Sequence, residues 1–135
     1  MNKITLAFLA LLPFSAFSQP VDPCIAKSST QEMSACAKAE YQQTSDRLDK
    51  TYKALIAQMP KKDVQGIPYQ AVKKQFPVAQ HAWVEFVAQD CRTISIYNKG
   101  SLLRDIEYYS CMRLHTEQRI SDLERFLSRR EKPKS

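Results

Sequence analysis

Glycine is scarce in this sequence, because only Gly66 and Gly100 occur among 135 residues. The chain therefore lacks a glycine-rich loop of the kind that holds phosphate groups, and it lacks the runs of tight turns that connect β-hairpins. This composition argues against a nucleotide-binding fold and a β-sandwich, and it favours helices. His81 and His115 are the only histidines. Because neither belongs to a histidine-rich metal motif or accompanies a nucleophile elbow, we expect surface or capping roles for both, no cofactor and no enzyme activity.

A long apolar run is also missing. A membrane-spanning helix needs about 20 consecutive apolar residues. The longest largely apolar stretch, Ile4 to Phe17, is shorter and is interrupted by Pro13. The positive Lys3 precedes it, which is the order of elements found in a secretory signal peptide.

A cleavage site follows this stretch. Ala16 and Ser18 place small residues three and one before a cut, as signal peptidases require. We therefore predict a signal peptide at residues 1–18 and a single domain at residues 19–135. The expected location is the bacterial periplasm or the exterior, with no membrane anchor after the signal is removed.

Four cysteines lie beyond the predicted signal peptide: Cys24, Cys36, Cys91 and Cys111. An even number of cysteines in an oxidising compartment indicates disulfide bonds. A zinc site would favour closely spaced pairs such as C-x2-C, whereas eleven, fifty-four and nineteen residues separate these cysteines. We expect two disulfides and no metal site.

Apolar residues recur at steps of three and four along three segments, which is the pattern of helices that bury one face. The first helix should begin after Ser29, because Ser29 and Glu32 have the spacing of a capping box. It should end before Pro60, since a residue that precedes proline is disfavoured in helical conformation. The buried stripe is predicted to contain Ala37, Tyr41, Thr44, Leu48, Tyr52, Leu55 and Met59.

The second segment contains Pro77, which leaves two interpretations open. Either a short helix around Tyr69–Gln75 kinks at Pro77, or Pro77 is the first residue of the helix. We expect Trp83 to be a core residue, although an exposed tryptophan would suit a binding site. The predicted stripe contains Ala79, Trp83, Phe86 and Ile94, with Val87 and Cys91 beside it.

A turn is predicted from Tyr97 to Gly100, and Ser101 is expected to cap a third helix that runs close to Arg130. The predicted fold class is therefore all-α, a small three-helix bundle or hairpin stapled by two disulfides. The apolar stripe of the third helix is predicted to contain Leu102, Ile106, Tyr109, Thr116, Ile120, Leu123 and Leu127.

The turn at Gly100 also predicts how the cysteines pair. Cys91 lies nine residues before Gly100 and Cys111 lies eleven after it, so the two would come level in a helical hairpin. Cys24 and Cys36 would be joined by an arm that folds back on the first helix. We favour these local pairs, while three connectivities remain formally open.

Charge gives a weaker indication of partners. The net charge is +6, which attracts a protein to anionic surfaces, but most basic residues are scattered along the chain. The exception is the C-terminal group of Arg129, Arg130 and Lys132, which could grip an anionic polymer. A solvated tail is the preferred interpretation, and no nucleic-acid partner is expected.

The remaining polar candidates lie on the first and third helices. Asp46 and Asp49 could form a carboxylate pair for acid–base chemistry, but we expect surface charges or partners for an arginine. Arg119 lies beside Thr116 on the third helix and is the candidate partner. These four residues are predicted to form a buried polar or ion-paired group.

Several short motifs follow one another between Cys24 and Leu123. They are the pair Cys24 and Cys36, a Leu-Asp-x-x-Tyr sequence within Asp46–Tyr52, Gln-x-x-Trp at Gln80–Trp83 with Phe86 and Cys91 after it, Gly100-Ser101, and C-x4-T-x2-R-x3-L at Cys111–Leu123. Together they resemble the LprI-type lysozyme-inhibitor family, whose members are small exported helical domains. Three departures are visible: Asp49 replaces an asparagine, Lys99 replaces the first glycine of a Gly-Gly-Ser turn, and Val87-Ala88 stands where the family commonly has Arg-Asp.

The resemblance implies a non-enzymatic binding protein that inhibits lysozyme. C-type lysozymes are themselves basic, so long-range electrostatic steering would not favour the encounter. A basic or hydroxyl side chain that enters the lysozyme cleft could still pair with the catalytic carboxylates, and the sequence does not identify that residue. Two alternatives stay open: a periplasmic adaptor or stress protein that binds another protein, and a binder of anionic envelope polymers through the C-terminal tail.

Overall fold

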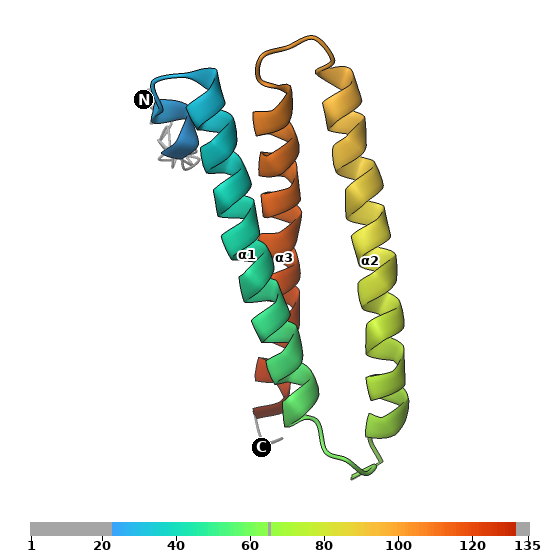
Figure 1. Cartoon of the computed structure of the whole chain (residues 1–135). Helices are drawn as coiled ribbons and strands as arrows, with labels where there is room; N and C mark the ends of the chain where they lie inside the picture. The colour runs from blue at the N-terminus through green and yellow to red at the C-terminus, as the bar shows by residue number, and fades with distance from the viewer. Residues whose placement is uncertain (1–22, 65, 132–135) are drawn as a thin grey trace, which may run out of the picture.

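The computed structural model describes residues 23–64 and 66–131 (Figure 1). Within these ranges the regular structure is helical, which confirms the predicted all-α class, and an isolated bridge joins Val64 to Ile67. The predicted signal peptide lies outside the described residues. None of the helices in the described ranges is both long and apolar enough to cross a bilayer. The elements are η1 (Pro23–Ala26), α1 (Thr30–Gln58), α2 (Tyr69–Tyr97) and α3 (Arg104–Glu131).

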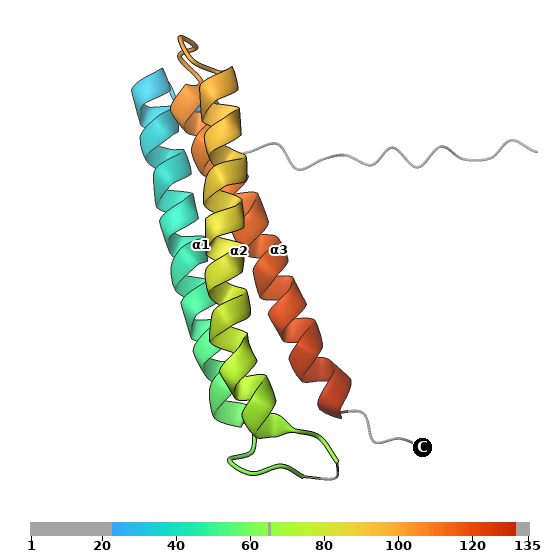
Figure 2. The ribbon, with the colours of Figure 1, turned by 90° about the vertical axis from the view of Figure 1, so that its right-hand side faces the viewer.

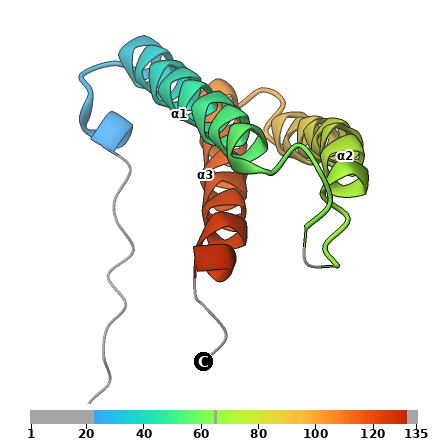
Figure 3. The same cartoon turned by 90° about the horizontal axis from the view of Figure 1, so that it is seen from below.

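The three long helices alternate in direction and form a triangle when seen from the end of the bundle, in which α3 contacts both α1 and α2 (Figures 1 and 3). The contact between α1 and α3 is extensive, whereas α2 packs on α3 more sparsely. The α2–α3 turn lies at the same end of the bundle as the start of α1, and the α1–α2 connector lies at the other end (Figures 1 and 2). The bundle therefore has two distinct ends, and α1 and α2 meet through side chains such as Tyr52 and Phe76, whose ring centroids are 6.5 Å apart.

The ends of α1 follow from its sequence. Ser29 is the N-cap, and its hydroxyl oxygen accepts a hydrogen bond from the backbone N–H of Glu32 at 3.2 Å. The Glu32 carboxylate accepts from the backbone N–H of Ser28 at 3.1 Å, so the reciprocal contact falls one residue earlier than in a standard capping box. The helix ends at Gln58, and Met59 is extended before Pro60. Both predicted boundaries of the first helix are confirmed.

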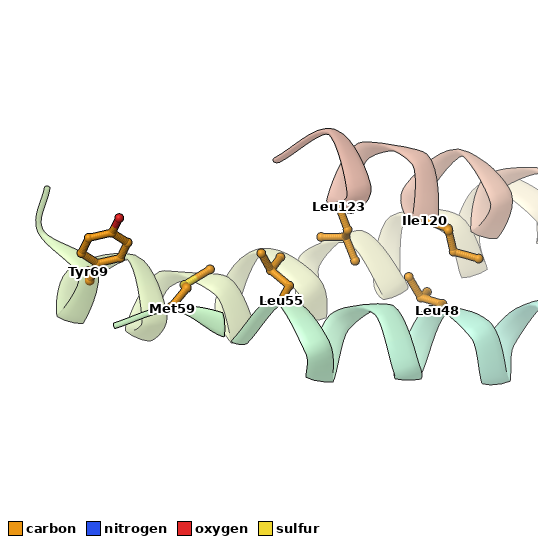
Figure 4. Close-up of a cluster of buried hydrophobic side chains, with 6 residues drawn as sticks. All are labelled: Leu48, Leu55, Met59, Tyr69, Ile120 and Leu123. Carbon is orange, nitrogen blue, oxygen red and sulfur yellow. The ribbon is translucent and has the colours of Figure 1, made fainter. Parts of the chain in front are cut away.

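Most of the core lies between α1, the start of α2 and the second half of α3 (Figure 4). Two predicted core residues, Leu48 and Leu123, are buried there, and two others, Tyr52 and Trp83, are partly buried and pack against the cluster. A second, smaller cluster at the other end contains Cys24, Ala37 and Ile106. The main cluster consists of Leu48, Leu55, Met59, Tyr69, Ile120 and Leu123.

The buried stripe of α2 differs from the prediction. The helix continues through Pro77 from Tyr69, so the interpretation that Pro77 begins the helix is wrong. Phe86 was expected in the core but is 58% exposed, whereas Val87 is buried. The reason is geometric, because successive residues of a helix are turned by about 100°, so Phe86 and Val87 cannot both face the centre of the bundle. Val87 faces the other helices and is 1% exposed, whereas the Phe86 ring lies to one side, edge-on to the His115 ring of α3.

The start of α3 also differs from the prediction. The helix begins at Arg104, and Ser101 lies in the preceding turn, where its hydroxyl oxygen accepts from the backbone N–H of Leu103 at 3.1 Å. Leu102 is consequently outside the helix and is 81% exposed. Farther along, Ile106, Thr116, Ile120 and Leu123 are buried as predicted, and Tyr109 is partly buried. The Leu127 side chain lies outside the described part.

Two disulfides join the cysteines in the expected local pairs. Cys24 and Cys36, whose Cα atoms are 5.5 Å apart, fasten η1 to α1. Cys91 and Cys111, with Cα atoms 5.6 Å apart, connect α2 to α3. The second bond therefore fixes the helical hairpin close to its turn.

Candidate functional site

Several residues of the sequence motifs converge on one groove, which we call the motif groove. It lies between α1 and α2, has α3 at its base, and holds about 200 Å³. Three motif residues from different helices, Asp49, Gln80 and Thr116, line it together with Trp83. Its other lining residues are Tyr41, Ser45, Leu48, Val84, Val87 and Met112.

A three-residue contact, the Gln80–Arg119–Trp83 clamp, connects α2 to α3 beside this groove. The Arg119 Nε–H donates to Gln80 Oε1 at 3.1 Å. The guanidinium carbon of Arg119 also lies 5.9 Å from the centroid of the Trp83 ring, which is within cation–π range and contributes roughly 0.5–2 kcal/mol. The clamp uses motif residues to hold two helices in register.

Asp46 and Asp49 were predicted to be surface charges or partners of an arginine, and the structure shows the first of these roles. Asp46 and Asp49 are exposed on α1, and no ion pair joins either of them to Arg119 among the described residues. The amide of Gln80 occupies the position of the arginine's partner instead. The buried ion-paired group therefore does not form, because a neutral amide satisfies the half-buried guanidinium without the desolvation of a carboxylate.

Thr116 is buried, as its place in the predicted stripe of the third helix indicated. Its hydroxyl donates to the backbone carbonyl of Met112, one turn earlier, at 2.7 Å. Thr44 on α1 makes the same contact with the carbonyl of Glu40 at 2.8 Å. Both hydroxyls are satisfied within their own helices, so they fit into the apolar seam between α1 and α3 without an unpaired polar atom.

Tyr41 is a polar member of the groove that the sequence indicated only as part of an apolar stripe. Its ring stacks on Tyr109 with centroids 6.2 Å apart. Burial, together with the neighbouring Tyr108, raises the pKa of the Tyr41 hydroxyl, although a hydrogen bond with Ser45 opposes the shift. Tyr41 is therefore neutral at physiological pH and offers the groove a hydroxyl that can donate or accept a hydrogen bond.

A second concave surface, the α2/α3 groove, lies on the outer side of the hairpin and holds about 370 Å³. Here His115 Nε2 lies 2.8 Å from Asp90 Oδ2, and the Phe86 ring meets the His115 ring edge-on. His115 also lies close to Cys91 and Cys111, but their sulfur atoms are bonded to each other and are not free to bind a metal.

The other histidine has a simpler setting. His81 Nδ1 lies 3.6 Å from the Glu85 carboxylate one turn along α2, and both side chains are mostly exposed. Each histidine therefore has an acidic neighbour at the surface, as expected for surface roles.

The structure describes only part of the basic C-terminal group. The backbone of α3 extends through Arg129 and Arg130 to Glu131, whereas their side chains and all of Lys132 lie outside the described part. Binding of an anionic polymer by this segment stays a prediction.

The fold and its contacts define a small three-helix protein of the disulfide-stapled, extracytoplasmic kind, in which motif residues join the helices. Residues 24–123 match the family model described as "Lysozyme inhibitor LprI". Since this match covers most of the chain, the protein belongs to the LprI lysozyme-inhibitor family. It is also similar to an uncharacterized protein of Rhizobium meliloti (strain 1021), with 22% identity over 113 residues and 81% of each chain covered. No solved structure matches the chain.

Proposed function

We propose that this protein is exported and that it binds and inhibits a lysozyme. The observation that carries the proposal is the family match, which extends from Cys24 of the first disulfide to Leu123 of the main core. It therefore includes both disulfides, the clamp and most of the three-helix scaffold. The family is one of inhibitors and not of enzymes, so the activity expected of this chain is binding.

The disulfides support an extracytoplasmic location, because such bonds persist in oxidising compartments. Lysozymes cleave the bacterial cell wall, which lies in the same compartment. Export through a signal peptide at residues 1–18, with cleavage after Ser18, would bring the inhibitor to the periplasm or the exterior. Inhibitor and enzyme would meet at the wall.

The charge balance affects how binding must occur. Removal of residues 1–18 takes away Lys3 and lowers the net charge from +6 to +5, and a chain of this charge gains no long-range attraction toward a basic lysozyme. Affinity must then come from shape and from a few local contacts, as in interfaces dominated by a small number of residues. We expect inhibition that is competitive with an oligosaccharide and that survives moderate salt, since salt screens the overall repulsion.

The test is the turbidity loss of a cell-wall suspension exposed to C-type, G-type or invertebrate-type lysozyme. The inhibitor is the oxidised protein purified from the periplasm, with its helical content verified by circular dichroism. We expect micromolar or lower concentrations to slow at least one class of lysozyme. Absence of inhibition of every class by folded protein at micromolar excess would refute the proposal and would favour an adaptor function. If the protein instead binds anionic polymers in a salt-sensitive manner, and this binding is lost on removal of residues 129–135, polymer binding by the C-terminal segment would be favoured.

A further inference from the structure

The turn between α2 and α3 exposes several large apolar side chains. We define the tip as residues 96–103, which project at one end of the bundle (Figure 1). Tyr97 is 88% exposed, Leu102 is 81% exposed and Ile96 is 63% exposed, and Leu103 is exposed as well. Large apolar side chains gathered on a projecting turn are typical of an interaction site.

Backbone hydrogen bonds hold the tip in one conformation. The N–H of Asn98 donates to the carbonyl of Ile94 at 3.0 Å, and the N–H of Ser101 donates to the carbonyl of Asn98 at 2.9 Å. The side-chain amide of Asn98 adds a bond to the Ile94 carbonyl at 3.1 Å. Gly100 has φ of +92°, a conformation that glycine adopts without strain. The projecting turn is therefore a defined surface.

The Cys91–Cys111 disulfide lies behind the tip and fixes the two helices that carry it. A cross-link at this position limits how far the helices can separate when a partner presses on the turn. Such preorganisation reduces the ordering cost of binding. The tip thus combines exposed apolar groups with a rigid support.

Charge at the tip is limited to one residue. Lys99 is the only charged residue between Ser95 and Leu103, and it is exposed. The next charge along the chain, Arg104, is paired with Asp105 at 3.0 Å. The tip therefore presents a single ammonium group between Tyr97 and Leu102.

The active site of a retaining glycosidase is complementary in charge and shape to this apolar tip with its single ammonium group. Two carboxyl groups lie about 5–5.5 Å apart at the bottom of a sugar-binding cleft, and a projecting turn fits a concave cleft. We propose that the tip inserts into the substrate cleft of the lysozyme, with the Lys99 ammonium pairing with the catalytic carboxylates and Tyr97 and Leu102 packing against the cleft walls. This inference rests on the proposed function and identifies the surface that performs it.

Two other surfaces fit this role less well. The motif groove lies between the helices on the side of the bundle and does not project. The α2/α3 groove is also concave, and its Asp90 and Glu107 carboxylates match a basic surface of lysozyme and not the acidic cleft. A partner held only at that groove would leave its cleft open to substrate.

The experiment compares variants of the oxidised full protein in the lysozyme assay. Lys99→Met removes the charge and keeps the length of the side chain, and Tyr97→Ser with Leu102→Ser removes the apolar contacts. The matched controls are Lys62→Met in the α1–α2 connector and Val78→Ser on α2, because both residues are exposed and distant in sequence from the tip. We expect Lys99→Met and the double variant each to raise the inhibition constant by about tenfold or more. The controls should remain within about twofold of the original protein, and all variants should keep its thermal midpoint.

The possible results separate the two proposals. Inhibition by the original protein that is competitive with a chito-oligosaccharide, and that weakens in the tip variants, supports insertion of the tip. If the original protein inhibits and the tip variants inhibit equally well, the tip is not the inhibitory surface, although the proposed function stands. If the double variant Asp90→Asn with Glu107→Gln loses inhibition and the tip variants keep it, the inhibitory surface is the α2/α3 groove and not the tip. If the original protein inhibits no lysozyme, both proposals fail.

Discussion

Removing the Cys91–Cys111 disulfide should lower the free energy of unfolding by about 3 kcal/mol. The bond links residues with a sequence separation of 20. Closing a loop of this length removes chain entropy from the unfolded state, and the standard expression then gives about 3.3 kcal/mol at 25 °C. The Cys24–Cys36 bond closes a separation of 12, for which the same expression gives about 2.8 kcal/mol.

These similar values apply to different parts of the molecule. Cys91–Cys111 joins two long helices, of which α2 packs on α3 only sparsely, so its loss should weaken the whole bundle. Cys24–Cys36 fastens the four-residue η1 to α1. Removing the Cys24–Cys36 disulfide should cost less than the calculated value if η1 detaches without unfolding the helices, because a local opening does not release the full loop entropy.

The assay is urea unfolding followed by far-ultraviolet circular dichroism, with paired cysteine-to-alanine variants of each disulfide. Alanine is chosen because Cys91 and Cys24 are completely buried, and a serine hydroxyl there would add a desolvation cost. For a small domain of typical stability, about 5–15 kcal/mol, a loss of about 3 kcal/mol leaves a folded protein with a much lower midpoint. A loss below about 1 kcal/mol for the Cys91–Cys111 pair, or a larger loss for Cys24–Cys36, would refute this reasoning.

Four further predictions test the core, the tip, the groove and export. Trp83→Ala should destabilise by about 2–4 kcal/mol in thermal unfolding, at or below the range for a fully buried aromatic, whereas Phe86→Ala should cost less than about 1 kcal/mol because Phe86 is exposed; equal losses would contradict the observed helix face. Gly100→Ala should cost about 1 kcal/mol, because φ is +92° although a Cβ meets no atom within 4 Å. Ultraviolet titration should place the pKa of Tyr41 above the usual tyrosine value near 10. The free energy of unfolding should then fall as the pH rises above about 10, because the tyrosine of the unfolded state loses its proton at a lower pH than that of the folded state. Mass spectrometry of periplasmic protein should show a chain that begins after Ser18, and an intact Met1 would contradict export with cleavage.

Sequence patterns predicted the helix boundaries that local chemistry controls. The Ser29 cap and the break at Pro60 depend on residues next to the helix ends, so each could be recognised without a tertiary structure. The third helix was harder to place. Ser101 has the chemistry of a cap, but its hydroxyl serves the turn, and the helix begins at Arg104.

The face of α2 could not be chosen from its sequence. Phe86 and Val87 are both apolar and adjacent, and either could belong to a stripe with Trp83 at helical spacing. Only the packing of α2 on α3 decides between them, and it buries Val87. The same limit applies to the clamp, because Gln80 and Arg119 are 39 residues apart and meet only when the hairpin register is fixed. Sequence reasoning therefore considered Asp46 and Asp49 as candidate partners of Arg119, whereas the structure shows the amide of Gln80 there.

Residues that identify the family and residues proposed to select a partner occupy different parts of this protein. Trp83, Thr116 and Arg119 join or fill the space between helices, so their presence specifies the scaffold. Lys99, in contrast, departs from the family's turn motif and stands exposed at the tip. A change at this position leaves the helical core intact and alters the charge offered to a partner. Family membership therefore specifies the scaffold, whereas the proposed contact with a lysozyme depends on residues of the tip that the family motifs do not share.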